Sequence, residues 1–265
     1  MLSRSHEAVA SSSNLLLSKL TPLDYQRLLP HLRAVSLPAG HTLYEAGASI
    51  QNVYFPAQCV VSLRLTASAG TDVEVAAIGR EGLVGIDACF GGMPPTHRAE
   101  VIIGGKAWQA PASLVREDFS RGGALGKLLL RFNQSLHTQT CQAALCCRLH
   151  SVEQRLSNLL LSLRNRVGTD EVSLTQEEVA HMLGVRRSGV TVAAGILRAE
   201  GLIEYRRGSM TVVDAARLGS RACECYHVVG KPIGTAVKDL TVIPSPHYGR
   251  ASRPRYARLP IALSG

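Results

Sequence analysis

The sequence has no run of about 18 apolar residues, which is the length a helix needs to cross a bilayer. Its N-terminus also lacks the basic-then-apolar order of a secretory signal peptide. We therefore expect a soluble, cytoplasmic protein without a membrane partner. The seven cysteines are an odd number without the regular spacing of a secreted disulfide framework, so reduced thiols are expected.

Signatures of catalysis and of metal binding are also missing. There is no Walker phosphate-binding loop, no Gly-x-Ser-x-Gly elbow and no paired Cys-x-x-Cys set. Two groups could be imagined as metal ligands, namely Cys146-Cys147 with His150, and Cys223 with Cys225. Buried helix cysteines are far commoner than such ligands. The sequence therefore predicts a protein that is not an enzyme, with no catalytic residue, no metal and no cofactor.

Acidic residues are few relative to basic ones. The chain has 20 Asp and Glu and 29 Lys and Arg residues, which gives a net charge of +9 and a pI near 9.5. Such a charge fits a polyanionic partner, and by itself it fits nucleic acid and an anionic membrane equally. A length of 265 residues suits two ordinary domains, each able to bury a core.

Residues 173–199 have the pattern of two short helices joined by a tight turn. Thr175 and Glu178 have the spacing of a capping box, so a helix should begin near Gln176 and end at Gly184. In the second helix one face is apolar, through Val190, Ala194 and Leu197, and the opposite face carries Arg187, Thr191, Gly195 and Arg198. Arginines and hydroxyls are the groups that read guanine edges and phosphates in a major groove.

A basic hairpin is expected directly after these helices. Residues 202–205 and 210–213 are apolar-rich runs joined by Arg206-Arg207-Gly208-Ser209, whose Gly-Ser suits a primed turn. Its cationic tip would grip backbone phosphate. The alternative is an ordinary helical hairpin with a basic solvated surface, but the strict order of helix, turn, Arg-bearing helix and basic hairpin favours a winged helix-turn-helix.

The N-terminal half is expected to be mostly β. A leading helix is expected over Asn14–Leu32, with Thr21 as a new N-cap and Pro22 as the first helical position after it. Short β-like runs then alternate with Gly and Pro, and this spacing predicts an antiparallel barrel or double-sheet roll. The runs are Val35–Leu37, His41–Tyr44, Val53–Phe55, Val60–Leu65, Val73–Ala76, Val101–Ile103 and Ala107–Gln109. Residues 112–167 are helix-rich, with an apolar stripe formed by Leu125, Leu128, Leu129, Phe132 and Leu136.

This succession resembles the Crp-Fnr family of bacterial transcription regulators over roughly residues 14–225. The specific portion is LTQEEVAHMLGVRRSGVTVAAGILRAEGLI, and the roll contributes Ala39-Gly40, Glu45-Ala46-Gly47 and Val53-Tyr54-Phe55-Pro56. The resemblance implies an α+β fold: a cyclic-nucleotide-binding-like β-roll at 14–120, a dimerisation helix region at 121–150 and a winged helix-turn-helix at 151–226. Residues 227–265 carry six basic residues against one aspartate and are expected to form a basic disordered tail.

The resemblance also implies a sequence-specific regulator that binds double-stranded DNA as a homodimer on an inverted repeat, with RNA polymerase as a further partner. The residues expected to contact DNA are Gln176, Arg186, Arg187, Ser188, Thr191, Arg198, Arg206 and Arg207. Ser188 replaces the family's base-reading glutamate and Val192 its second arginine, so the usual half-site cannot be carried over. In the family the long helix pairs with its twofold mate. Its apolar stripe could instead form an intramolecular core, since it is not a strict heptad.

Departures from the family's effector sites are equally specific. Gly85 is followed by Ile86, so the ribose-binding carboxylate of the cyclic-nucleotide cassette is absent. His97 and Arg98 could hold another anion, and the alternative for Arg98 is a loop arginine paired with a surface carboxylate. No cysteine precedes Cys59, which excludes the N-terminal iron–sulfur ligands of the family's oxygen sensors. Haem ligation by a single His or Cys stays open.

A second class of function competes with DNA binding. The chain could be a cupin-like metalloenzyme or ligand-binding module whose winged domain serves protein contact. A cupin needs two or three histidines and a carboxylate inside the barrel, whereas the roll has only His41 and His97, far apart and without a His-x-His pair.

Overall fold

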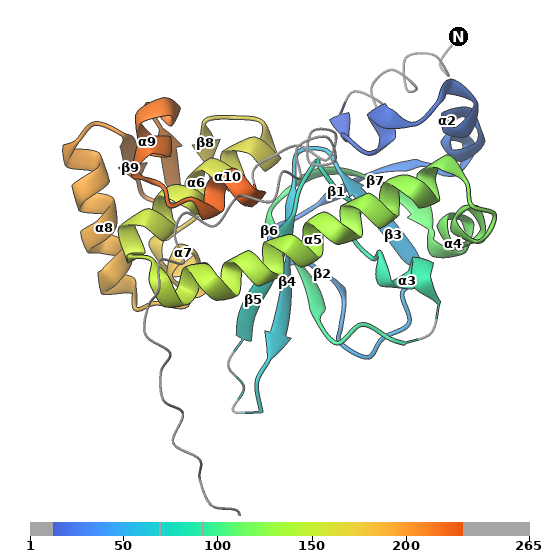
Figure 1. The fold of residues 1–265 in the computed structure, drawn as a ribbon, viewed down its shortest axis with the longest axis horizontal. Coiled ribbons are helices and arrows are strands. Elements are labelled where there is room, and N and C mark those ends of the chain that lie inside the picture. The colour runs from blue at the N-terminus through green and yellow to red at the C-terminus, as the bar shows by residue number, and fades with distance from the viewer. Residues whose placement is uncertain (1–12, 69, 71, 92, 230–265) are drawn as a thin grey trace, which may run out of the picture.

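The computed structural model describes residues 13–68, 70, 72–91 and 93–229. A two-sheet β-roll is followed by a long helix and by a winged helix-turn-helix, as the sequence predicts (Figure 1). Most of the predicted tail, from residue 230, lies outside the described residues, and its first residues belong to helix α10 (Cys225–Val229). Among the described residues, none of the helices combines the length and the apolar character needed to span a bilayer.

The leading segment is broken where one helix was predicted. It consists of the 3-10 helix η1 (Leu17–Lys19), the helix α2 (Pro22–Leu28) and the 3-10 helix η2 (Leu29–His31). The break comes at Thr21, which is extended because it precedes a proline. The Thr21 hydroxyl accepts a hydrogen bond from the Asp24 amide, and this confirms the start expected at Thr21-Pro22.

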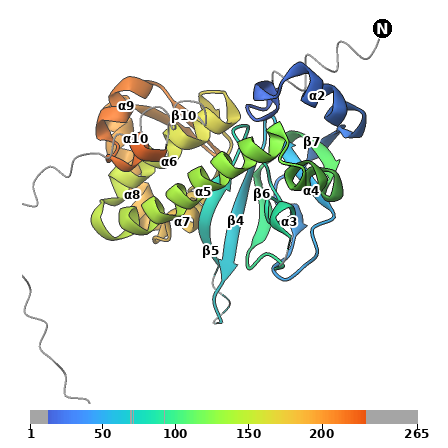
Figure 2. The same cartoon turned by 45° about the vertical axis from the view of Figure 1, so that its right-hand side comes forward.

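The seven predicted strands all form, and they make two antiparallel sheets. One has the order β1-β7-β3 and the other the order β2-β6-β4-β5. Figure 2 shows helix α5 lying across the strands of the roll. The strands are β1 (Arg33–Leu37), β2 (Thr42–Tyr44), β3 (Asn52–Pro56), β4 (Val60–Thr66), β5 (Asp72–Ile78), β6 (Arg98–Ile103) and β7 (Gly105–Pro111). Two short helices complete the roll, α3 (Asp87–Phe90) and α4 (Ala112–Ser120).

Helix α5 (Ala124–Leu149) crosses the whole molecule, and much of its predicted apolar stripe faces inward. Leu125, Leu129 and Phe132 are buried in the core of the roll. A Cβ atom at Gly82 would lie 2.4 Å from the Phe132 ring, so the glycine makes room for this side chain. The stripe expected to face a second copy is thus largely an intramolecular core, because the roll offers it an apolar surface.

The C-terminal half contains the predicted helix-turn-helix and one additional strand. Its elements are α6 (Val152–Val167), β8 (Glu171–Val172), α7 (Gln176–Leu183), α8 (Arg187–Ala199), β9 (Ile203–Arg206), β10 (Ser209–Val212) and α9 (Ala215–Arg221). The strands pair in the order β8-β10-β9. The last helix, predicted from Asp214 to about Tyr226, is two helices, since α9 ends at Arg221 and Ala222 is extended.

A second hydrophobic cluster spans the junction between the two halves. Leu156, Leu160 and Leu163 of α6 are fully buried in a cluster that also contains Val60 and Ile103 of the roll. Arg166 at the end of α6 donates from Nε to Glu81 Oε1 over 2.9 Å, and this bond ties the helix to the loop after β5. The winged half is therefore packed against the roll as well as linked to it.

Glu74 on β5 is a titratable group at this junction. Its Oε2 accepts a hydrogen bond of 2.6 Å from the Ser62 hydroxyl on β4. Burial raises the pKa of Glu74 to about 7, against the opposing effects of the Ser62 bond and of the Arg166 and Arg64 charges. The folded protein therefore holds a proton here that the unfolded chain, with a value near 4.5, releases at lower pH.

We expect the free energy of unfolding to fall through this group as pH rises from about 4.5 to about 7, and to level off above that, because only the folded state keeps the proton in this range. Glu74→Gln should make the fall in the free energy of unfolding over this pH range smaller by about 1–3 kcal/mol. Urea unfolding followed by circular dichroism between pH 5 and 8 measures it, with Glu45→Gln at an exposed carboxylate as the matched control. A Glu74→Gln profile as steep as that of the unmodified protein would contradict the assignment.

Candidate nucleic-acid interface

Helix α7 has the predicted capping box at its start and the predicted glycine at its end. The Thr175 backbone N–H donates to Glu178 Oε2 over 2.6 Å, and the Glu178 N–H donates to Thr175 Oγ1 over 3.2 Å. Gly184 has φ +61 and ends the helix in the left-handed conformation. These local bonds set where the turn to α8 begins.

Helix α8 has the two faces that the sequence predicts. Val190, Ala194 and Leu197 are buried against α6 and α7, and Ala193 joins them. The predicted contact residues Arg186, Arg187, Ser188 and Arg198 are exposed on the other side. Arg186 precedes the helix in the N-cap position without a side-chain cap, so its guanidinium is not used to hold the helix start.

Two further side chains of this exposed surface were not among the DNA contacts predicted from the sequence. Val192 is 65% exposed and Ile196 is 40% exposed, which is unusual for large apolar residues in a packed domain. The hydrophobic period of α8 would have revealed their exposure, since both residues fall outside the apolar face that is buried. Apolar groups on a recognition helix can contact the thymine methyl group in the major groove.

Gln176 and Thr191 are brought together rather than left separately exposed. The Thr191 hydroxyl lies 2.8 Å from Gln176 Oε1 and 3.1 Å from the Arg187 carbonyl oxygen, and its single proton can be donated to either. Gln176 is buried, so it braces the start of α7 against α8. Arg187 is freer, with 66% of its side chain exposed and its Nε 3.9 Å from Glu177 Oε2. The predicted DNA contacts of these residues stay predictions.

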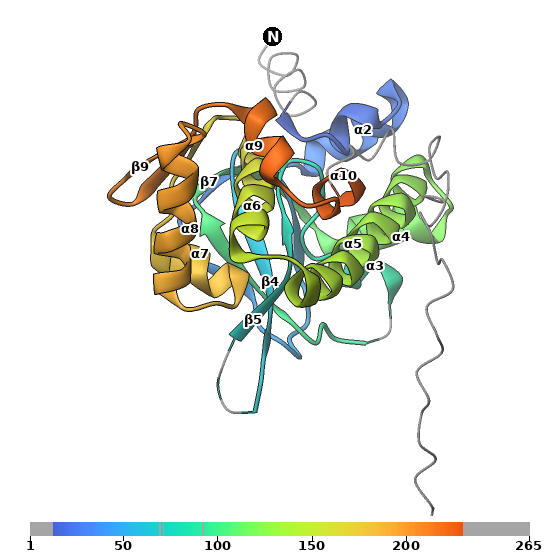
Figure 3. The same cartoon turned by 60° about the vertical axis from the view of Figure 1, so that its left-hand side comes forward.

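The wing is a tight hairpin beside α8. Ser209 pairs with Arg206 across a two-residue turn, in which Gly208 has φ +79. Arg206 and Arg207 are exposed at this tip, and Figure 3 shows the hairpin projecting from the domain next to α8. The Ser209 hydroxyl donates to Glu171 Oε1 over 2.7 Å and so ties the tip end of the wing hairpin to β8.

In the roll, the two residues proposed for an effector already have protein partners. Arg98 Nη2 lies 2.5 Å from Asp72 Oδ2 and 2.9 Å from Glu100 Oε2. These contacts match the alternative of an arginine paired with carboxylates, and an anion would have to compete with both. His97 Nε2 lies 3.0 Å from the Tyr44 hydroxyl, and burial lowers the pKa of His97 against the opposing charge of Asp87.

The segment that corresponds to the cyclic-nucleotide cassette has an apolar side chain at the ribose position. Ile86 is buried, and Gly85 before it has φ +91. A Cβ atom at Gly85 would lie 3.1 Å from Ile50 and 3.4 Å from Val53, so the backbone turns here in close contact with the start of β3 and the residues before it. The residue at the ribose position therefore offers no carboxylate for a sugar hydroxyl.

Comparisons with known proteins agree with this architecture. Residues 154–221 match the Crp-like helix-turn-helix domain. Over 208 residues the chain is 26% identical to a CRP-like cAMP-activated global transcriptional regulator of Mycobacterium tuberculosis, which covers 76% of this chain and 93% of that protein.

Solved structures share the fold at lower identity. FixK2 from Bradyrhizobium japonicum superposes with a TM-score of 0.61 at 15% identity, over 72% of this chain and 98% of that one. A putative cAMP-binding regulatory protein from Silicibacter pomeroyi DSS-3 gives 0.59 at 20% identity, over 83% and 99%. Residues 154–221 thus match a Crp-like helix-turn-helix domain, and the chain is a distant relative of CRP-like transcriptional regulators, whose fold it shares.

Proposed function

We propose that the protein regulates transcription as a homodimer bound to an inverted-repeat operator, with each α8 in a major groove and each wing on backbone phosphate. The observation that carries the proposal is the exposed arginine set on two adjoining elements, Arg187 on α8 and Arg206-Arg207 on the wing. Two such helices related by a twofold axis would read half-sites about 34 Å apart. The match to a Crp-like helix-turn-helix domain and the similarity to a CRP-like regulator favour a regulator over a cupin-like enzyme.

The exposed groups of α8 suggest what kind of bases it reads. Arg187 stands at the start of the helix, where a guanidinium can pair with the O6 and N7 atoms of a guanine. Val192 and Ile196 offer methyl groups suited to thymine, at positions where an arginine would favour guanine instead. A half-site that combines a guanine with neighbouring thymines fits this surface.

The homodimer is proposed on the outer face of α5. Leu130, Leu145 and Leu149 remain exposed there, and His137 and Cys141 lie on the same face at helical spacing. Because the inner face is used by the roll, this outer face is the apolar surface left for a second copy. RNA polymerase is the further partner expected for a dimer bound near a promoter. An effector that acts through the roll would have to shift the packing of the roll against α6.

Arg187→Ala should weaken binding to the preferred operator by about 1–3 kcal/mol while leaving binding to random duplex DNA nearly unchanged, because the lost contact is with a base. The operator is first obtained by selection from random DNA, and affinities are then measured by fluorescence anisotropy. Arg33→Ala, which removes an exposed arginine from the roll, is the matched control. An unchanged ratio of specific to non-specific affinity would contradict a base-reading role.

Replacing Arg206 and Arg207 together by alanine should weaken binding to operator and random DNA alike, since phosphate contacts are independent of sequence. The slope of log affinity against log salt should become shallower by about one to two units per protomer. Anisotropy titrations at several salt concentrations measure this slope. A change of sequence preference at constant slope would show that the wing reads bases instead.

Leu130→Glu should raise the dimer dissociation constant at least about tenfold, because the dimer would bury a carboxylate among apolar side chains. Sedimentation velocity over a concentration series measures the constant. Leu23→Glu is the matched control, as Leu23 is similarly exposed but lies on α2, away from α5. Equal effects of the two substitutions, or a monomeric parent protein, would exclude this face as the dimer contact.

A further inference from the structure

Three cysteines and one histidine, separated along the chain, meet beside the end of α5. Cys146 lies on α5 and His150 is its C-terminal cap, while Cys223 lies between α9 and α10 and Cys225 begins α10. One donor atom from each residue lies within 4.8 Å of all the others. Cys223 and Cys225 are buried, and Cys146 and His150 are partly buried.

Two of the separations within this group are close to those that a single tetrahedral ion requires. With zinc–sulfur bonds of about 2.3 Å and zinc–nitrogen bonds of about 2.0–2.1 Å, tetrahedral ligands stand about 3.8 Å apart for two sulfurs and about 3.5 Å apart for sulfur and nitrogen. Cys146 Sγ lies 3.6 Å from Cys223 Sγ. Cys225 Sγ lies 3.4 Å from His150 Nδ1. The sulfurs are also too far apart for a disulfide bond, which is about 2.05 Å long.

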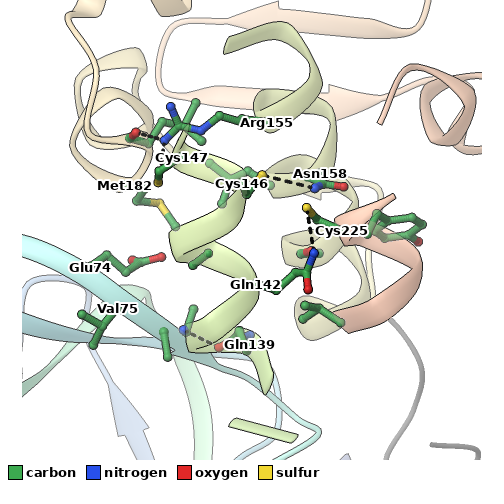
Figure 4. A pocket seen from close by; sticks show the side chains of 18 of the residues that line it. Glu74, Val75, Gln139, Gln142, Cys146, Cys147, Arg155, Asn158, Met182 and Cys225 are labelled. Carbon is green, nitrogen blue, oxygen red and sulfur yellow. Dashed lines mark hydrogen bonds between the residues drawn. The ribbon is translucent and has the colours of Figure 1, made fainter. Parts of the chain in front are cut away.

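The residues around these donors form the outer shell that metal ligands usually have. His150 points its Nδ1 atom at the sulfurs, and its Nε2 atom lies 3.2 Å from Glu224 Oε1. Such a carboxylate orients a metal-bound histidine and raises its basicity. Asn158 donates an amide hydrogen to Cys223 Sγ over 2.9 Å, and Gln142 donates one to Cys225 Sγ over 3.1 Å. Figure 4 shows the Gln142 amide directed at Cys225 Sγ and the Asn158 amide directed toward Cys146 Sγ.

We propose that Cys146, His150, Cys223 and Cys225 bind one Zn²⁺ ion as a closed structural site. Thiolates with one imidazole are a ligand set typical of structural zinc, and four protein donors leave no open position for chemistry. An iron–sulfur cluster places several atoms between its cysteine ligands, whereas all four donors here lie within 4.8 Å. The separation therefore favours a single ion.

The proposed ion would clamp the C-terminal segment onto the long helix. Cys146 and Cys223 are 77 positions apart, and the entire winged helix-turn-helix lies between them. Bringing the ends of so long a loop together costs conformational entropy. Metal binding offsets this cost and stabilises the folded state, because the unfolded chain has no formed site for the ion. This inference concerns how the winged half is held and does not depend on the proposed operator or dimer.

The full-length protein, purified without added metal, should contain about one zinc per chain by inductively coupled plasma mass spectrometry. Cys223→Ser should lower the zinc content at least tenfold. Cys141→Ser and Cys147→Ser are the matched controls, since both remove exposed thiols from α5 that lie outside the cluster. Zinc retained in Cys223→Ser, iron with acid-labile sulfide, or a Cys146–Cys223 disulfide in fresh protein would each overturn the proposal.

A second variant decides the matter if Cys223→Ser does not fold. Glu224 is 69% exposed, so Glu224→Gln changes the outer shell at little risk to the fold. Its affinity for Zn²⁺, measured by competition with a chromophoric chelator on metal-free protein, should be about 10–100-fold lower than that of the parent protein. Tetrahedral cobalt–thiolate absorption after Co²⁺ loading is expected in both proteins. An unchanged zinc affinity, or cobalt spectra without thiolate bands, would overturn the site.

Discussion

The structure depends on the packing of α6 between the roll and the helix-turn-helix. Its fully buried leucines, among them Leu156, Leu160 and Leu163, belong to the same hydrophobic cluster as Val60 of the roll and Val190 of α8. Each such side chain contributes about 1.5–3 kcal/mol on burial. Because one helix serves both neighbours, a displacement of the roll would be transmitted to α8 through a close-packed core.

Helix α5 illustrates how one amphipathic element can serve two partners. Its first half packs Leu129 and Phe132 into the roll, so this face stabilises the chain by itself. Leu130 and Leu149 point elsewhere and remain exposed. Large apolar side chains in solvent along one helix are a feature of surfaces that another molecule covers. The proposed dimer thus uses the outer face of α5, which stays exposed when the single chain folds.

The end of α5 carries a different kind of contact from its middle. There the partners are the thiols of Cys223 and Cys225, with amide groups from Gln142 and Asn158 around them. Burial and the neighbouring thiols of Cys223 and Cys225 raise the pKa of Cys146. The segment containing Cys223 and Cys225 is thereby attached to the end of the long helix through this polar group.

The sequence by itself determined the features that arise from neighbours a few residues apart. The Thr175–Glu178 capping box, the left-handed Gly184 and the start at Thr21-Pro22 need only local atoms, and the seven strands follow from local alternation between turns. Only the tertiary structure decided contacts across distance. It brought Asp72 to Arg98, turned Leu129 toward the roll and placed Cys146 against Cys223, because these pairings depend on which elements fold against one another and not on the spacing within any one of them.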